Sequence, residues 1–283
     1  PTRACSGRRF ASSKIVHFQR QFLLQWGGHL SVAAPLKRNS LAAHLSNRFD
    51  LRSCKCTPQY MHPSYERIMS SCLPHVILIH GLGRHSTSMR RLATTLRRQN
   101  YQITNWGYSS RAHTLDVLAD QLTEVYTQIA QTATIIHVVT HSMGGIVLRR
   151  LLARTELPQL GKIAMLAPPN NGSQVAYHLL ANPLLKSLLG PAAYALTDCA
   201  TLNALCAVPS TPILVIAGTN ARDVRNPVSL LSRSLLQEPN DGTVTVRETV
   251  LPRMDMFIQV PACHTLIMNH PDTVTAVREF LRA

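Results

Sequence analysis

Acidic side chains are scarce in this sequence. It holds 14 Asp and Glu against 29 Lys and Arg among 283 residues, a formal net charge of +15. Such an excess is typical of nucleic-acid binders, of proteins at acidic membranes, or of a basic tail. Residues 1–75 carry 11 basic and two acidic side chains, whereas residues 76–283 carry 18 and 12. Most of the excess therefore lies in the first quarter of the chain.

Long apolar runs are missing as well. The apolar stretch 22–36 is interrupted by Gln25, Gly27, Gly28 and His29, so it is too short and too polar to cross a membrane. Residues 1–74 show no sustained period of a strand or a helix and no RNA-binding aromatic motif. We expect a basic, poorly ordered extension there, with a nucleic-acid-binding arm or a targeting peptide as alternatives. We expect no transmembrane segment and no nucleic-acid partner.

Paired cysteine motifs are absent too. Of seven cysteines, Cys54 and Cys56 stand one residue apart, which is not the spacing of a zinc site. If 199–206 is helical, Cys199 and Cys206 are about 10 Å apart along the axis, too far for an unstrained disulfide. We therefore expect no metal and no cofactor, and the cysteines do not fix the redox compartment.

From residue 75 onward, apolar runs alternate with segments of helical spacing. Six runs are predicted to be strands, most of them buried on both faces: 75–81, 101–107, 134–140, 162–167, 212–218 and 256–260. Helices are predicted over 86–99, 114–132, 145–154 and 272–283. This alternation predicts an α/β fold over 75–283, with a mostly parallel central sheet flanked by helices.

The stretch VVTHSMGGIVLRRLL, residues 138–152, places a serine on a turn from strand to helix. In the G-x-S-x-G nucleophile elbow, such a turn projects the serine hydroxyl above the sheet. Thr140 stands where the pattern has its first glycine. On this pentapeptide alone, a catalytic serine at Ser142 and an ordinary tight turn are equally good interpretations.

Three other segments favour the catalytic interpretation. The turn after the first strand, HGLG at 80–83, can present backbone N–H groups, and we expect the N–H groups of Leu82 and Met143 to hold an oxyanion. A serine also needs a base and an orienting acid. Asp241 follows one predicted strand and His264 the next, where parallel sheets carry their sites.

Other residues compete for these roles. His141 adjoins the serine, but neighbouring side chains diverge on a sharp turn, so we favour a packing role for it. Asp223 is the main rival for the acid, and we favour Asp241 because a strand-like TVTV segment follows it. His270 is interpreted as a turn residue before the last helix.

The motifs HGLG, THSMGG, NDGTV and CHT, in this order, resemble the α/β-hydrolase family, in particular its small bacterial lipases and esterases. The resemblance covers residues 75–283. It implies a nucleophilic Ser142, His264 as general base and then acid, Asp241 as its orienter, and cleavage of carboxylic esters through an acyl-enzyme. The compartment is not readable from the sequence; between a bacterial cytoplasm and periplasm, we slightly favour the cytoplasm.

The segment 170–208 is an apolar insertion with few charges. Pro183, Gly190 and Pro191 are expected to cut it into short helices. We expect a cap over the carboxyl edge of the sheet, with Leu185, Leu188 and Leu189 lining a pocket for small to medium acyl chains. The alternative is that the segment packs elsewhere as scaffold.

Two further classes of function stay open. The same residues serve thioesterases, amidases and acyltransferases, and the fold does not choose among them. A non-catalytic α/β-hydrolase acting as a binding module is the second alternative. The sequence does not indicate an oligomeric state.

Overall fold

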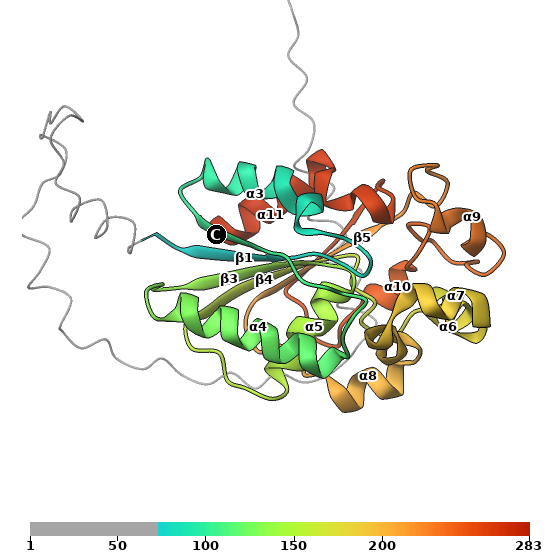
Figure 1. Cartoon of the computed structure of the whole chain (residues 1–283). Coiled ribbons are helices and arrows are strands. Elements are labelled where there is room, and N and C mark those ends of the chain that lie inside the picture. The colour runs from blue at the N-terminus through green and yellow to red at the C-terminus, as the bar shows by residue number, and fades with distance from the viewer. Residues whose placement is uncertain (1–72) are drawn as a thin grey trace, which may run out of the picture. The chain divides into compact units, whose positions relative to one another are not determined.

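The computed structural model describes residues 73–283 (Figure 1). The expected extension over 1–74 thus falls almost wholly outside the described residues, and its order and role stay predictions. Within the described part, the side chains of Leu184, Leu185 and Leu188 are not described.

A six-stranded parallel sheet forms the centre of residues 73–283, with the strand order β2-β1-β3-β4-β5-β6. The strands are β1 His75–Ile79, β2 Gln102–Trp106, β3 Ile136–His141, β4 Leu160–Leu166, β5 Ile213–Gly218 and β6 Met256–Val260. Each agrees within two residues with a run predicted from the sequence. The predicted α/β architecture with a parallel sheet is confirmed.

Alternate residues of β1 enter two separate cores, because successive side chains of a strand point to opposite faces. Ile77 and Ile79 join one apolar cluster with α4 and α5, whereas Val76 and Leu78 join the other with α3 and α11. Figure 1 shows the two helix pairs on opposite faces of the sheet. This double burial explains why the inner strands β1, β3, β4 and β5 are mainly apolar runs.

The four helices predicted outside the insertion begin and end close to their expected positions. They are η2 Ser86–Met89 with α3 Arg90–Arg97, α4 Leu115–Ala130, α5 Met143–Leu152 and α11 Pro271–Arg282. The structure also contains α9 Val228–Ser232, α10 Val246–Thr249 and η4 His264–Asn269, which were not predicted. Thr114 caps α4 by accepting a hydrogen bond from the Val117 N–H. Pro271 occupies the first turn of α11, where its missing N–H costs nothing.

The insertion 170–208 forms four short helices at the end of the sheet where the strands finish (Figure 1). They are α6 Gln174–Ala181, α7 Pro183–Leu189, η3 Pro191–Leu196 and α8 Cys199–Leu205. Breaks fall at Pro183, Gly190 and Pro191, as expected. Ala192, Leu196 and Leu202 join the core around α4 and α5, so the second half of the insertion also serves as scaffold.

The TVTV segment was predicted to be strand-like, and this was wrong. Thr245 instead caps α10, accepting from the Glu248 N–H, while the Glu248 side chain accepts from the Thr245 N–H. This reciprocal capping box satisfies two N–H groups that a strand would have paired with a neighbour.

Across residues 73–283, no helix is long and apolar enough to cross a membrane.

Candidate active site

Ser142 occupies the turn between β3 and α5 in a strained conformation. Its φ of 53° and ψ of −128° lie in a region that residues with a β-carbon rarely adopt. Glycines make the turn possible: a β-carbon on Gly144 would lie 2.7 Å from the carbonyl oxygens of Ile79 and His80. The strain and the close packing together fix the direction of the serine side chain.

The structure brings the three side chains expected to form a triad into one chain of hydrogen bonds. His264 Nε2 lies 3.0 Å from Ser142 Oγ, and His264 Nδ1 lies 2.7 Å from Asp241 Oδ2. A carboxylate oxygen can only accept, so Nδ1 carries the proton and Nε2 faces the serine hydroxyl as an acceptor. The arrangement can withdraw a proton from Ser142.

Asp241 is fully buried, and its second oxygen is held by the backbone. Oδ1 accepts from the N–H groups of Thr243 at 3.0 Å and Val244 at 2.8 Å. Asp223, the rival acid, forms an ion pair with Arg225 at 2.6 Å. The hydrogen bonds and charge of Arg225 hold the pKa of Asp223 far below its usual range. Of the two acids, the structure brings only Asp241 to His264.

The two residues expected to donate to an oxyanion each adjoin a residue that is at the serine: Met143 follows Ser142 itself, and Leu82 follows Gly81. Met143 is the first residue of α5, so its N–H has no partner within the helix and lies at the positive end of the helix dipole. Leu82 follows Gly81, on which a β-carbon would lie 2.9 Å from the Ser142 β-carbon. The two backbone segments therefore meet at the serine, where a reacting carbonyl oxygen would lie.

Tyr108 supports the Leu82 turn, a role that the sequence did not predict. Its hydroxyl donates to the His80 carbonyl at 2.7 Å, and its ring stacks on the His80 ring with centroids 4.2 Å apart. The Trp106 ring also stacks on the Tyr108 ring, with centroids 4.3 Å apart. The available signal was an aromatic residue just past the end of β2, at the same sheet edge as HGLG.

A model of the family described as "Alpha/beta hydrolase family" matches residues 76–277. The chain belongs to the α/β hydrolase family. A comparison with curated proteins gives no match. In the parallel sheet of this chain, the segments after β1, β3, β5 and β6 converge at one edge, which is where such folds carry their sites.

Solved structures of a lipase, a phospholipase and a carboxyl esterase are similar at low identity. Bacillus licheniformis lipase BlEst2 in its mature form is 19% identical with a TM-score of 0.58, over 79% of this chain and 94% of that one. Phospholipase PlaB from Legionella pneumophila is 18% identical with a TM-score of 0.61, over 75% and 60%. The metagenomic carboxyl esterase MGS0156 is 17% identical with a TM-score of 0.58, over 74% and 75%. These likenesses show the shared fold.

The two histidines that compete with His264 for the role of base, His141 and His270, have structural partners. His141 is buried, and its Nε2 lies 3.0 Å from the carbonyl oxygen of His264. Burial, followed by the neighbouring charges of His264 and Arg84, lowers the pKa of His141 well below its ordinary value. His270 caps α11, accepting from the Asp272 N–H at 3.3 Å.

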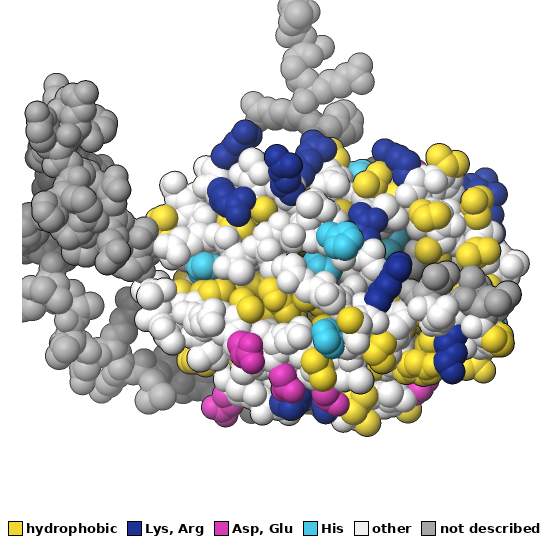
Figure 2. Space-filling model, viewed as in Figure 1, with side chains coloured by type: hydrophobic (Ala, Val, Ile, Leu, Met, Phe, Trp, Pro, Cys, Tyr) yellow, Lys and Arg dark blue, Asp and Glu magenta, His cyan; other side chains and the backbone are white. Residues whose placement is uncertain are grey.

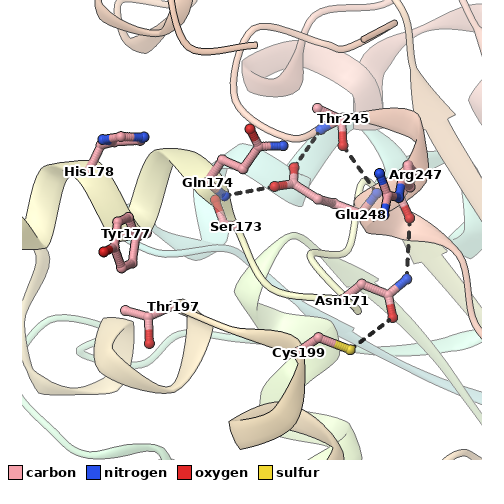
Figure 3. Close-up of a pocket in the computed structure, with 10 residues that line it drawn as sticks. All are labelled: Asn171, Ser173, Gln174, Tyr177, His178, Thr197, Cys199, Thr245, Arg247 and Glu248. Atoms are coloured by element: carbon pink, nitrogen blue, oxygen red, sulfur yellow. Dashed lines mark hydrogen bonds between the residues drawn. The ribbon is translucent and has the colours of Figure 1, made fainter. Parts of the chain in front are cut away.

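A pocket of about 500 Å³ lies between α6 and α10, and its lining is largely polar (Figure 3). The carboxylate of Glu248 spans the two helices: it accepts from the Gln174 N–H and the Thr245 N–H, each at 2.7 Å. Burial raises the pKa of Glu248. The side chains of Ser142, Asp241 and His264 do not line this pocket.

The expected acyl pocket stays a prediction. The side chains of Leu185 and Leu188 lie outside the described residues, and Leu189 is half-buried at the end of α7. Among the residues that line the polar pocket, Tyr177 of α6 is an exposed aromatic side chain of the insertion.

Within residues 73–283, no cluster of His, Cys, Asp and Glu could hold a metal ion.

Proposed function

We propose that this protein is a serine hydrolase that cleaves carboxylic esters through an acyl-enzyme. The observation that carries the proposal is the hydrogen-bonded chain Ser142–His264–Asp241 at the carboxyl edge of the sheet. The names of the similar structures, a lipase, a phospholipase and a carboxyl esterase, support the substrate class.

In this proposal, Ser142 Oγ attacks the ester carbonyl while His264 Nε2 takes its proton. Asp241 stabilises the imidazolium and holds its Nδ1–H in place. The N–H groups of Leu82 and Met143 donate to the oxyanion of the tetrahedral intermediate. His264 then returns the proton to the leaving alcohol. Water, activated by the same histidine, releases the acid and restores the serine.

Covalent labelling with a fluorophosphonate probe, followed by peptide mapping, tests the nucleophile. We expect the adduct on Ser142 in the native protein and no adduct in Ser142→Ala. Because the nucleophile and the base act as one unit, Ser142→Ala and His264→Ala should each abolish nearly all hydrolysis of a p-nitrophenyl ester, and the double variant should be little worse. An adduct on another residue would overturn the assignment.

The length of the acyl chain tests the expected pocket of the insertion. If Leu185, Leu188 and Leu189 line it, kcat/KM should rise from p-nitrophenyl acetate to butyrate or octanoate and fall at palmitate. Each buried CH₂ contributes up to about 0.8 kcal/mol until the pocket is full. A flat profile, or one unchanged when the three leucines are replaced by serine in a folded protein, would show that the segment is scaffold.

The same chemistry also acts on thioesters and amides. Comparing a p-nitrophenyl ester with a thioester and an anilide of the same acyl group ranks these alternatives. A protein that reacts with none of them and does not take up the probe would be a binding module.

A further inference from the structure

Two loops meet at the Leu82 turn, and a hydrogen bond ties them together. Residues 80–85 follow β1, and residues 107–114 follow β2. The Gly83 N–H donates to the Oγ of Ser110, which is buried, at 2.9 Å. The residue after Ser110 is therefore held next to the oxyanion loop.

That residue is Arg111, and its guanidinium group lies against Gly83. A β-carbon placed on Gly83 would lie 2.5 Å from Arg111 Nη2 and 3.0 Å from Nε, so the guanidinium occupies the space that a side chain would fill. The positive φ of Gly83, 64°, also favours glycine here. Gly81, which abuts Ser142, is only two residues away. Two residues of chain span at most about 7 Å. The guanidinium is thus within reach of a group carried by an ester at Ser142.

Arg111 is a cation without a partner. It is exposed, and it forms no ion pair and no side-chain hydrogen bond with any residue that the structure describes. The other arginine of the two loops, Arg84, already donates to the Thr265 carbonyl at 3.2 Å. The loops HGLGRH and GYSSRAHT contain no acidic residue. Neither loop therefore supplies a carboxylate that would compensate these charges.

Acidic and basic side chains are also separated on the surface of the protein. On the face drawn in Figure 2, Asp and Glu gather along the lower edge over α4, while Lys and Arg gather over α3. The α4 carboxylates of Asp116 and Asp120 are themselves paired with Arg150 and Arg154. They do not neutralise Arg111.

We propose that Arg111 binds an anionic group, a carboxylate or a phosphate, carried by the ester substrate. The inference rests on the proposed esterase function and names its substrate class. A guanidinium stays charged at all working pH values and offers a planar fork that matches both anions. Binding the anion at Arg111 would orient the ester carbonyl toward Ser142 Oγ, because the rigid Gly81–Gly83 turn joins the two positions.

The first arm of the test places the charge on the acyl part. The substrates are p-nitrophenyl hydrogen glutarate and its neutral methyl ester. For Arg111→Gln, kcat/KM on the charged ester should fall about tenfold, in line with a charge-assisted hydrogen bond at an accessible site, and change less than twofold on the neutral ester. Arg97→Gln, an exposed arginine of α3, is the matched control for net charge and should change neither value.

The second arm places the charge on the alcohol. The substrates are 1-hexanoyl-glycerol 3-phosphate and 1-hexanoyl-glycerol, with release of hexanoic acid as the readout. A selective loss for Arg111→Gln in either arm supports the inference and tells which part of the substrate carries the anion. Equal changes on charged and neutral esters in both arms overturn it.

A measurement on the native protein needs no variant. In the substrate pair for which Arg111→Gln shows a selective loss, the native protein should have a higher kcat/KM for the charged ester than for the neutral one. This ratio should shrink when NaCl is raised from 0.05 to 0.5 M, since salt screens exposed charges. A native protein that prefers neither charged ester also overturns the inference. The esterase proposal fails separately, if no neutral ester is hydrolysed and Ser142 is not labelled.

Discussion

The imidazole of His141 packs against that of His264, with ring centroids 4.8 Å apart and planes inclined at 46°. His141 Nε2 lies 3.0 Å from the His264 carbonyl oxygen, so Nε2 carries the proton and donates it. Its Nδ1 is buried without a hydrogen-bond partner among the described residues. The histidine next to the serine therefore fixes the backbone that carries the proposed base.

Replacing His141 should slow the reaction without weakening substrate binding. In His141→Leu, the His264 carbonyl loses its donor, and we expect kcat to fall about ten- to a hundredfold through misplacement of the imidazole, with KM little changed. His141→Gln keeps an N–H donor and should restore part of the rate. Steady-state kinetics of both variants on one p-nitrophenyl ester provide the measurement. Equal rates in the leucine and glutamine variants would contradict this role.

The two candidate acids should differ sharply when each is changed to an amide. Asp241→Asn presents an amide to His264 Nδ1 and favours the wrong imidazole tautomer, so we expect kcat to fall by about 10⁴. Asp223→Asn weakens the pair with Arg225, which does not touch His264, and should lower kcat by less than about threefold. Comparing kcat of the two variants decides between them. The reverse ranking would transfer the role to Asp223.

Adjacent glycines of the elbow should tolerate a methyl group very differently. A β-carbon on Gly144 meets two backbone oxygens at 2.7 Å, whereas on Gly145 the nearest atom, Thr140 Oγ1, is at 3.1 Å. Backbone cannot yield as a side chain can, so Gly144→Ala should destabilise by more than about 2 kcal/mol. Gly145→Ala should stay within about 1 kcal/mol of the native value, because alanine favours the helix. Urea unfolding of both variants tests this, and equal losses would contradict it.

Most of the fold was predictable because the four inner strands, β1, β3, β4 and β5, are largely buried on both faces and are therefore mainly apolar runs. The candidate site was predictable for a related reason: Ser142, Asp241 and His264 each follow a strand, and parallel strands bring such positions to one edge. The preference for Asp241 nevertheless used a wrong argument. Alternating Thr and Val residues predicted a strand at TVTV, but the capping box of Thr245 and Glu248 outweighs that local preference.

The support of the site was harder to predict, because it depends on contacts between distant segments. Nothing in the spacing of Tyr108 indicates that its hydroxyl reaches the His80 carbonyl. Arg149 carried a usable signal: it follows Gly145 by four residues and Ile146 by three, so the helical period places it on the inward face. Two adjacent arginines in the segment LRRLL nevertheless suggest a solvent-exposed position, which is why the burial of Arg149 was not predicted.

Acid should destabilise the fold through His137, which lies far from the proposed site at the start of β3. Burial, followed by the charge of Lys162, lowers its pKa from 6.5 to about 4. Between these values the unfolded chain binds a proton that the folded protein does not, so stability is full above pH 6.5 and falls as pH drops toward 4. The loss from this group is about 3 kcal/mol.

The variant His137→Asn isolates this contribution. The asparagine Oδ1 can replace Nδ1 as acceptor for the Lys162 N–H, which His137 binds at 2.9 Å, but it cannot take up the proton. Urea unfolding at pH values from 4 to 8 should show a shallower acid slope in the variant, with catalysis at pH 7 unchanged. An identical slope in both proteins would show that His137 does not cause it.

Arg149 ties both ends of the 170–208 insertion to α5, the helix that follows Ser142. This buried guanidinium donates from Nε to the Ala207 carbonyl at 2.9 Å and from Nη1 to the Asn170 carbonyl at 3.1 Å. Arg149→Met should leave these buried carbonyls unpaired and cost about 2–4 kcal/mol of stability. The insertion should loosen first, so limited proteolysis should cut within 170–208 sooner than in the native protein. Arg154→Met, which removes surface contacts with Asp116 and Asp120, should cost less than about 1 kcal/mol and leave the cleavage pattern unchanged. Cleavage outside the insertion in Arg149→Met would show that the guanidinium supports the core in general instead of clamping this segment.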